Sequence, residues 1–415
     1  MVPRHRKTLR GHLATHAVHA TTAFLFPLRL EGLSVGRSPH NFQREIQVHS
    51  SPTVSQAASV SRRVLRYSTT PSARNYALSD NMGQNVSTLF RANFNAAGFG
   101  SSLTADQVTE GIDLSQQTAI VTGATSGLGK ETARVLAKRG AHVILVGRKM
   151  DTAEQVKSVI LRETPSAQVD LMPLDLSNME SVRNFVKEFE AKNISLNILV
   201  NNAGVFNREF LFSDMGIEQM FATHVVGVFM LTELLLKKMK QSAKESGIEG
   251  RVVITGSDAH RLTSIYSDGI NFESLKKPGG YDPLKAYAQS KVGAILLAEE
   301  FASRLTEEKA NVTANVAHPG TVSSELGRTF IDKAIPGPDA VTDIAYKGIK
   351  PTLKTPEMGA ATICYIATRP EVKGVSGKYF ANCTEIQPNK DASNPQLRHK
   401  LWEYCEAITS AGVGM

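Results

Sequence analysis

Three side chains in the second half of the chain could move a proton to or from an oxygen atom. Tyr287 and Lys291 are four residues apart, so on a helix they would share one face. Ser257 ends an apolar run that begins at residue 251. An ammonium about 4 Å from a phenol, at an effective dielectric of about 20, supplies roughly the 4 kcal/mol that brings a tyrosine pKa from about 10 to near 7. We therefore predict Tyr287 as an acid or base near neutral pH, with Ser257 holding a substrate oxygen.

A glycine-rich turn points to the second reactant. The apolar run 118–122 breaks into Gly123, Gly127 and Gly129, and an amphipathic helical pattern follows at once. Glycine lets the backbone approach a pyrophosphate, whose charge is met by the N–H groups and dipole of a helix N-terminus. The spacing Gly-x3-Gly-x-Gly differs from the Gly-x-Gly-x2-Gly of most dinucleotide-binding turns. We predict a bound dinucleotide, from which a hydride could pass to a carbonyl while Tyr287 supplies the proton.

The second predicted strand ends in two basic residues. An NAD site places an acidic residue about 20 positions after the glycines to bind the ribose hydroxyls, whereas a basic residue suits a 2′-phosphate. Arg148 and Lys149 stand at this point. We therefore predict NADP(H); the alternative is that both charges are simply solvated at the start of a helix.

The scaffold follows from the pattern of apolar runs. Runs typical of strands lie near residues 118–121, 142–146, 168–172, 196–200 and 251–257, with helical patterns between them. Apolar strands separated by helices pair in parallel with both faces covered. We predict one α/β domain, a doubly wound parallel sheet of Rossmann type. A capping-box pattern at Thr104 and Gln107 predicts a short helix ahead of the first strand.

Two adjacent amides follow the fourth predicted strand. Asn201 and Asn202 precede an Ala-Gly pair at 203–204. A buried amide is costly unless it is hydrogen-bonded. We expect these side chains to tie the central strands together beside the cofactor.

Residues 1–81 have the composition of a transit peptide or a disordered extension. Residues 1–74 hold eleven Lys or Arg and two acidic residues, whereas the 415-residue chain has a net charge of +8. The positive charge belongs mostly to this segment, so it does not indicate nucleic-acid binding. We predict a folded domain at 82–415 without a transmembrane segment, because no apolar run approaches about 20 residues. Three separated cysteines match neither a disulfide framework nor a metal site.

A second start is possible at Met82. The residues that follow it, 83–87, fit the N-myristoylation pattern if translation begins there. That start would make the protein cytosolic or membrane-attached, whereas the transit peptide would make it organellar.

From about residue 99 onward, these motifs together resemble the short-chain dehydrogenase/reductase family. The resemblance rests on Gly-Ile-Asp at 111–113, TGxxxGxG at 122–129, NNAG at 201–204 and YxxxK at 287–291. It continues at residues 315–322, 374–380 and 400–402. Within the family the chain is most similar to the retinol-dehydrogenase-like branch and to its plant members, the plastid-translocon-associated dehydrogenases.

The resemblance implies an NADP(H)-dependent enzyme acting on CH–OH groups, without a metal. Ser257, Tyr287 and Lys291 would be catalytic, and Lys291 would also bond the nicotinamide ribose. The segment 323–357 would form a substrate lid, and its glycines and prolines suit a mobile loop. The implied cofactor contacts are Gly123, Ser126, Gly127, Leu128, Gly129, Arg148, Asp175, Asn202, Ala203, Tyr287, Lys291, Pro319, Gly320 and Thr321.

The chain departs from the family pattern at two positions. His224 stands where the family usually has an asparagine that serves the proton relay as a fourth catalytic residue. A histidine could carry the proton, or it could be a packed neutral side chain. Gly256 replaces the first serine of a Ser-Ser pair, a change that we expect to be mild because Ser257 aligns with the catalytic serine.

Two functions fit these residues. The first is reduction of a carbonyl, or oxidation of an alcohol, on an apolar small molecule, with Phe206, Phe210 and Phe212 as candidate lining. The alternative is an NADPH-binding redox sensor that works with an organellar protein-import partner and turns over little. A homodimer would use the long helices near His224 and Tyr287. The plant-like resemblance favours a plastid location, and the arginine richness favours a mitochondrion.

Overall fold

The computed structural model describes residues 102–263, 269–334 and 339–410. The predicted transit peptide or extension at 1–81 and the Met82 motif lie outside these residues.

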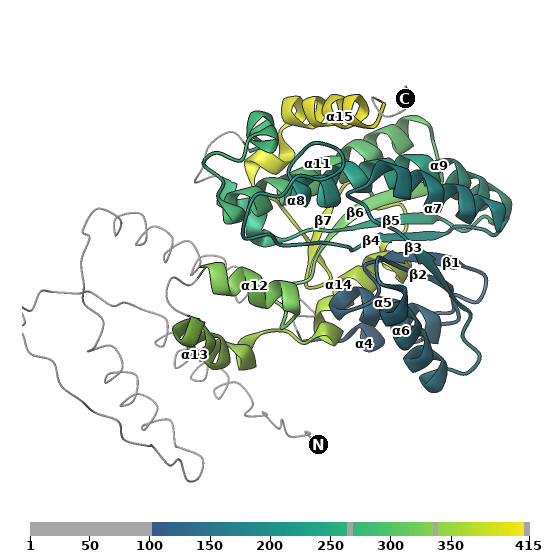
Figure 1. Cartoon of the computed structure of the whole chain (residues 1–415). Helices are drawn as coiled ribbons and strands as arrows, with labels where there is room; N and C mark the ends of the chain where they lie inside the picture. Colours follow the sequence, from purple (N-terminus) through teal and green to yellow (C-terminus); the bar gives the residue numbers. More distant parts are fainter. Residues whose placement is uncertain (1–101, 264–268, 335–338, 411–415) are drawn as a thin grey trace, which may run out of the picture. The chain divides into compact units, whose positions relative to one another are not determined.

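An eight-stranded sheet forms the centre of the domain, in the order β3-β2-β1-β4-β5-β6-β7-β8 (Figure 1). All neighbours pair in parallel except the terminal pair β7 and β8. Strand β1 is buried along its whole length, as expected for a strand covered on both faces. The predicted doubly wound α/β fold is therefore confirmed. The strands are β1 Thr118–Thr122, β2 His142–Gly147, β3 Val169–Pro173, β4 Ile198–Asn201, β5 Gly250–Thr255, β6 Val312–His318, β7 Tyr379–Ala381 and β8 Thr384–Ile386.

Helices cover both faces of the sheet (Figure 1). One face carries α4 Ala105–Val108, α5 Gly127–Lys138, α6 Met150–Glu163 and α14 Pro356–Thr368. The other carries α7 Met179–Ala191, α9 Gly227–Ser246, α11 Pro283–Glu307 and α15 Pro395–Ser410. Two large apolar clusters, one on each face, form the core. The short helices are α8 Gln219–Phe221, η2 Ala222–Val226, η3 Asp258–Leu262, η4 Phe272–Lys276, η5 Lys350–Thr352, η6 Pro370–Val372 and η7 Lys390–Ser393.

One helical stretch is longer and more apolar than the sequence pattern suggests. Helices α8, η2 and α9 run together as Gln219–Ser246, which is long and apolar enough to cross a membrane. The expectation that no segment reaches this length is wrong. The most apolar window of the stretch is 83% buried within the fold, as in the core helix of a globular domain.

The predicted lid segment is largely helical. It contains α12 Glu325–Ala334 and α13 Asp339–Ile349, and residues 335–338 between them are not described. In α12, Arg328 forms ion pairs with Asp332 and with Asp343 of α13. The expected mobile loop is therefore two helices held together by charged side chains.

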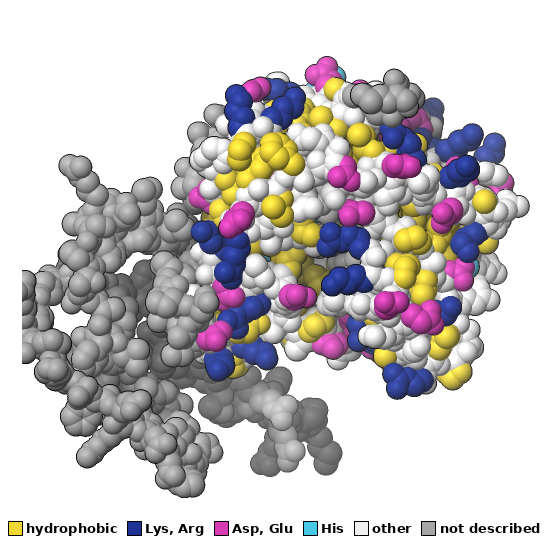
Figure 2. Space-filling view, in the orientation of Figure 1, with side chains coloured by type: hydrophobic (Ala, Val, Ile, Leu, Met, Phe, Trp, Pro, Cys, Tyr) yellow, Lys and Arg dark blue, Asp and Glu magenta, His cyan; other side chains and the backbone are white. Residues whose placement is uncertain are grey.

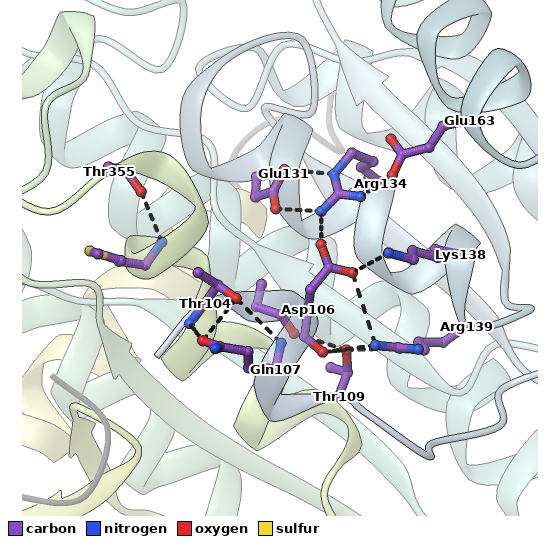
Figure 3. Close-up of polar contacts among 12 residues, drawn as sticks. Thr104, Asp106, Gln107, Thr109, Glu131, Arg134, Lys138, Arg139, Glu163 and Thr355 are labelled. Atoms are coloured by element: carbon purple, nitrogen blue, oxygen red, sulfur yellow. Dashed lines mark hydrogen bonds and ion pairs between the residues drawn. The ribbon is translucent and has the colours of Figure 1, made fainter. Parts of the chain in front are cut away.

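The predicted capping box is confirmed and opens the N-terminal helix α4. Thr104 Oγ1 accepts the backbone N–H of Gln107, whose side chain in turn accepts the backbone N–H of Thr104. Asp106 of α4 then pairs with Arg134 and Lys138 of α5 (Figure 3). The short helix is thus fastened to α5, the helix that follows the glycine turn.

Charges are mixed on the face of the domain shown in Figure 2. Lys and Arg alternate with Asp and Glu over this face and form no continuous basic patch. The net positive charge of the whole chain is therefore not concentrated there.

Candidate active site

A cavity of about 890 Å³ opens at the carboxyl ends of the parallel strands. The turns after β1, β2, β3, β4, β5 and β6 form its wall, together with parts of α11 and α12. This edge of a doubly wound sheet is where ligands bind. The cavity brings together all the predicted catalytic and cofactor-binding residues except Gly129 and His224.

The glycine turn fits a pyrophosphate. Gly123 has φ +66°, and a Cβ there would lie 2.8 Å from Ala203 Cα. Gly127 has φ +51° and begins α5, with only Ser324 Cβ near the position that a side chain would take. Ser126 makes no side-chain cap to the helix. The first N–H groups of α5 therefore face a space that a dinucleotide's phosphates can fill.

Gly129, predicted as a cofactor contact, has a packing role in this structure. It is buried, and a Cβ there would approach Gly123 O to 2.2 Å and Asn202 Nδ2 to 2.5 Å. The absence of a side chain lets α5 lie directly against the turn. Gly129 thus positions the glycine turn without lining the cavity.

The tandem amides tie the end of β4 to its neighbours. Asn202 Nδ2 donates to Thr122 O at 3.0 Å, and Thr122 Oγ1 accepts the backbone N–H of Asn202 and of Ala203. Asn201 instead turns to the helix layer, where its Nδ2 donates to Thr232 of α9. The expected link between central strands is therefore made by Asn202 alone.

Arg148 lies where a 2′-phosphate would be expected. Its side chain is 57% exposed and lines the cavity with Lys149. Asp175 is its carboxylate neighbour, at 3.9 Å, and accepts hydrogen bonds from Ser177 through its other oxygen. The guanidinium keeps enough freedom to meet an anion.

Ser257, Tyr287 and Lys291 converge on one wall of the cavity. Tyr287 and Lys291 share a face of α11, and the lysine Nζ lies 5.5 Å from the centroid of the tyrosine ring. This Nζ donates to Thr255 O at the end of β5, 3.0 Å away. A hydrogen bond joins Tyr287 to Ser257, whose hydroxyl also accepts the backbone N–H of Ala259. A phenol and a serine hydroxyl thus meet beside a fixed ammonium.

Burial determines the protonation states of Tyr287 and Lys291, and it moves the pKa of Tyr287 away from the expected value near 7. Burial raises the pKa of Tyr287 to about 12, although the hydrogen bond from Ser257 opposes the rise. Burial also lowers the pKa of Lys291 to about 8. The expected value near 7 for Tyr287 is therefore wrong for this structure. Near neutral pH the phenol carries its proton and the lysine its charge, a combination suited to donating a proton.

His224 lies behind Tyr287 and outside the cavity lining. Its Nε2 accepts the backbone N–H of Val205 at 2.9 Å, so the proton of the neutral ring is on Nδ1, which donates to Ser290 Oγ at 2.9 Å. Burial, helped by the charge of Lys291, lowers the pKa of His224 well below its usual value. The residue lies in the π-helix η2, a distortion often found at functional sites. Of the two alternatives, this geometry is that of a packed neutral histidine.

The end of the cavity near Tyr287 is aromatic. The ring of Phe206 lies 5.5 Å from that of Tyr287 and 5.6 Å from that of Phe330 on α12. Leu326, one turn earlier in α12, lines the same region. Only Phe206 among the three predicted lining residues is there, because Phe210 packs on Tyr281 and Phe212 is 58% exposed. Leu326 and Phe330 were missed because no motif identifies residues of the lid.

A buried polar cluster next to Ser257 was also missed. Asp258, His318 and Tyr379 meet behind the serine turn. Two of these residues could have been found from the sequence, because Asp258 directly follows Ser257 and His318 directly precedes Pro319. Among the described residues, no group of three or more His, Cys, Asp and Glu could hold a metal.

Comparisons with known proteins agree with this geometry. The family model for short chain dehydrogenases matches residues 117–267. The chain is 45% identical over 309 residues to "Short-chain dehydrogenase TIC 32 B, chloroplastic" of Brassica napus, covering 74% of this chain and 93% of that one. It is 37% identical over 290 residues to the polyprenol dehydrogenase of Homo sapiens, covering 69% and 84%. A crystal structure of a protein from Mycobacterium Paratuberculosis has a TM-score of 0.56 at 26% identity, covering 74% of this chain and 98% of that one.

Proposed function

This chain belongs to the short-chain dehydrogenase family of nicotinamide-dependent oxidoreductases, and on that premise we propose that it interconverts a carbonyl and an alcohol on an apolar small molecule with NADP(H). The observation that carries the proposal is the meeting of Ser257, Tyr287 and Lys291 in the cavity that the glycine turn also lines. A hydroxyl pair with a fixed ammonium beside a dinucleotide-sized cavity suits hydride transfer coupled to proton transfer.

The residues that would hold the cofactor come from several turns. The N–H groups that open α5 would meet the pyrophosphate, and Arg148 with Lys149 would meet a 2′-phosphate. Asp175, Asn202, Ala203 and residues 319–321 line the same cavity and would contact the rest of the cofactor. When bound, the cofactor supplies or accepts the hydride at the substrate carbon.

The protonation of the site favours the direction of reduction. Tyr287, protonated near neutral pH, would donate its proton to the carbonyl oxygen as that carbon gains a hydride. The resulting phenolate would be stabilised by Lys291, whose charge at pH 7 follows from a pKa of about 8. Ser257 would hold the substrate oxygen through its hydroxyl.

His224 would position this machinery instead of carrying protons. Both of its ring nitrogens are bonded within the protein, and its pKa is held low. It ties Val205, on the cavity wall, to the helix that carries Tyr287. The histidine would therefore take over only a structural role at the position where the family usually has an asparagine, and it would not relay a proton.

The substrate would be apolar. Phe206, Leu326 and Phe330 surround the space above Tyr287, and an aromatic lining binds apolar groups through buried area. The name of the 37% identical human relative, polyprenol dehydrogenase, supports this class of substrate.

NADPH oxidation by the full chain across apolar aldehydes, ketones and quinones tests the proposal. We expect turnover with NADPH that drops with NADH, and a loss of about 10²–10⁴-fold in kcat for Tyr287→Phe with NADPH affinity retained. Tight NADPH binding without turnover on any carbonyl would overturn it in favour of a redox-sensing partner of a protein-import machinery.

The names of the Brassica napus relatives also support a plastid location. Incubation of the labelled full chain with isolated chloroplasts and with isolated mitochondria tests this. Protease-protected, shortened protein in chloroplasts is expected, and protection only in mitochondria would contradict it.

A further inference from the structure

Asp258 is a buried carboxylate directly after Ser257. Its side chain is 8% exposed, and its Oδ1 accepts the hydroxyl proton of Tyr379 at 3.1 Å. Its Oδ2 lies 3.5 Å from His318 Nε2. A carboxylate so far from water is tolerated only with partners of this kind. Arg261, three residues later, also pairs with Oδ1, with its Nε 3.4 Å away. The location of Asp258 therefore depends on Arg261 and on residues of β6 and β7.

These partners reach the neighbouring turn of the cavity wall, after β6. His318 is the last residue of β6, and the turn 319–321 that follows it lines the cavity. The ring of Tyr379, on β7, stacks parallel to that of His318, with centroids 6.3 Å apart and planes 10° apart. Asp258 thus lies between the turn that carries Ser257 and the turn expected to contact the cofactor.

The glycine at 256 makes room for this arrangement. A Cβ at Gly256 would lie 3.1 Å from Tyr379 Cε2 and 2.5 Å from Val316 Cγ1. The Cβ of the serine that the family pattern usually has here would collide with Val316 and crowd the ring of Tyr379. The absence of a side chain at Gly256 therefore leaves space for the buried ring of Tyr379.

A second set of contacts holds the serine turn from the other side. His260 Nδ1 donates to Ser257 O at 2.7 Å, while its Nε2 accepts the backbone N–H of Asn389. Its ring lies edge-on to that of Tyr379, 5.0 Å away. The backbone carbonyl of Ser257 is thus held by His260, while the next residue, Asp258, is held by Tyr379 and His318.

We propose that Asp258 is a positioning residue which, through Tyr379 and His318, couples the Ser257 turn to the turn at 319–321. Cofactor binding against residues 319–321 would then set the placement of the serine hydroxyl that holds the substrate oxygen. This inference rests on the proposed function for its catalytic consequence, but the coupling between the two turns is a property of the chain itself.

Two variants test the proposal in the full chain. Tyr379→Phe removes only the hydroxyl that donates a hydrogen bond to Asp258. Asp258→Asn removes the negative charge of the side chain and nearly keeps its shape. Glu249→Gln is the control: Glu249 is also buried and paired with an arginine, Arg251, but neither residue lines the cavity. Each protein is compared for NADPH affinity by nucleotide fluorescence, for kcat and KM, and for the deuterium isotope effect on kcat with deuterated NADPH.

Both variants should lower kcat roughly tenfold to a hundredfold, the scale of a small misplacement of reacting groups. Their isotope effect on kcat should rise, because hydride transfer becomes slower, and their NADPH affinity should fall. Glu249→Gln should keep all three values. A fall in activity with an unchanged isotope effect and unchanged NADPH affinity would indicate a loss of folded protein only and overturn the proposal.

Amide hydrogen exchange separates this proposal from the proposed function. In the wild type, NADPH should slow exchange in both 318–321 and 256–262. In Tyr379→Phe it should slow exchange in 318–321 alone. Equal protection of both turns in the variant would overturn the coupling, even if the wild type reduces carbonyls. If NADPH protects the two turns as expected but the protein reduces no carbonyl, the coupling stands and only the proposed enzymatic function is overturned.

Discussion

The ring of His224 donates through Nδ1 to the hydroxyl of Ser290, 2.9 Å away, and this hydroxyl in turn donates a hydrogen bond to the backbone carbonyl of Tyr287. Because the other ring nitrogen accepts the N–H of Val205, the histidine links the cavity wall to α11. The link is entirely internal to the protein. It makes the placement of Tyr287 depend on a residue that does not line the cavity.

His224→Asn tests this link. The shorter amide cannot reach both Val205 and Ser290, and an unsatisfied buried partner costs about 1–3 kcal/mol of folding free energy. We expect a loss of about 2 kcal/mol in urea unfolding, a fall of roughly tenfold in kcat/KM and no change in the pH profile of kcat between pH 5 and 8. Faster turnover in the variant, or the loss of an ionisation from that profile, would instead indicate a proton relay through His224.

Arg148→Ala should change cofactor preference. A charge-assisted hydrogen bond to a phosphate contributes about 1.5–3 kcal/mol, so the KM for NADPH should rise by roughly 10- to 100-fold. NADH lacks the 2′-phosphate, and its KM should stay within about threefold. Initial rates with both nucleotides check this prediction, and an equal loss for both would show that Arg148 is not a phosphate ligand.

Phe330→Ala should weaken substrate binding without affecting the nucleotide. The ring lies against Phe206 and Tyr287, and its burial by an apolar substrate is worth about 1.5–3 kcal/mol. The KM for apolar carbonyls should rise about tenfold or more, while the NADPH Kd is unchanged. Phe212→Ala is the matched control, because Phe212 is exposed and outside the cavity. Equal effects of the two changes would remove α12 from the substrate site.

Stability should fall in mild acid because of buried neutral histidines. Burial lowers the pKa of His260 to about 4, whereas in the unfolded chain it is about 6.5. Between these values the unfolded chain binds a proton that the folded chain does not, so this contribution is complete above pH 6.5 and is lost as the pH falls toward 4. The loss from His260 is about 3 kcal/mol. Urea unfolding of wild type and His260→Asn at pH 7.5 and 4.5 checks this; equal losses in both would contradict it.

The ion pairs that join α4 to α5 should contribute to the free energy of unfolding. Arg134 is 14% exposed and pairs with Asp106, Glu131 and Glu163 (Figure 3). Arg134→Ala leaves these carboxylates without their shared partner and should cost about 2–4 kcal/mol. Lys138→Ala, at a 39% exposed position on the same helix, should cost less than about 1 kcal/mol. Unfolding followed by the fluorescence of the single tryptophan, Trp402, measures both; similar costs would mean that Arg134 acts only as a surface charge.

The sequence by itself determined the fold class and most of the cavity lining. Continuous apolar strands alternating with helices admit a parallel sheet, and such a sheet collects the carboxyl ends of its strands at one edge. For that reason Gly123, Arg148 and Ser257, which are far apart in the chain, could be assigned to one cavity. Tyr287 and Lys291 could be paired because helical spacing is a local property.

Only the tertiary structure decided how these groups behave. The pKa of Tyr287 depends on burial by segments from all over the chain, and a pairwise estimate with Lys291 missed it because spacing carries no information about desolvation. The tautomer of His224 is likewise set by Val205 and Ser290, and Ser290 is only one of the unspecified positions of the YxxxK motif. The contact of Asp258 with Tyr379 joins residues 121 positions apart. Such contacts arise from the packing of non-neighbouring strands, and no local pattern in the chain encodes them.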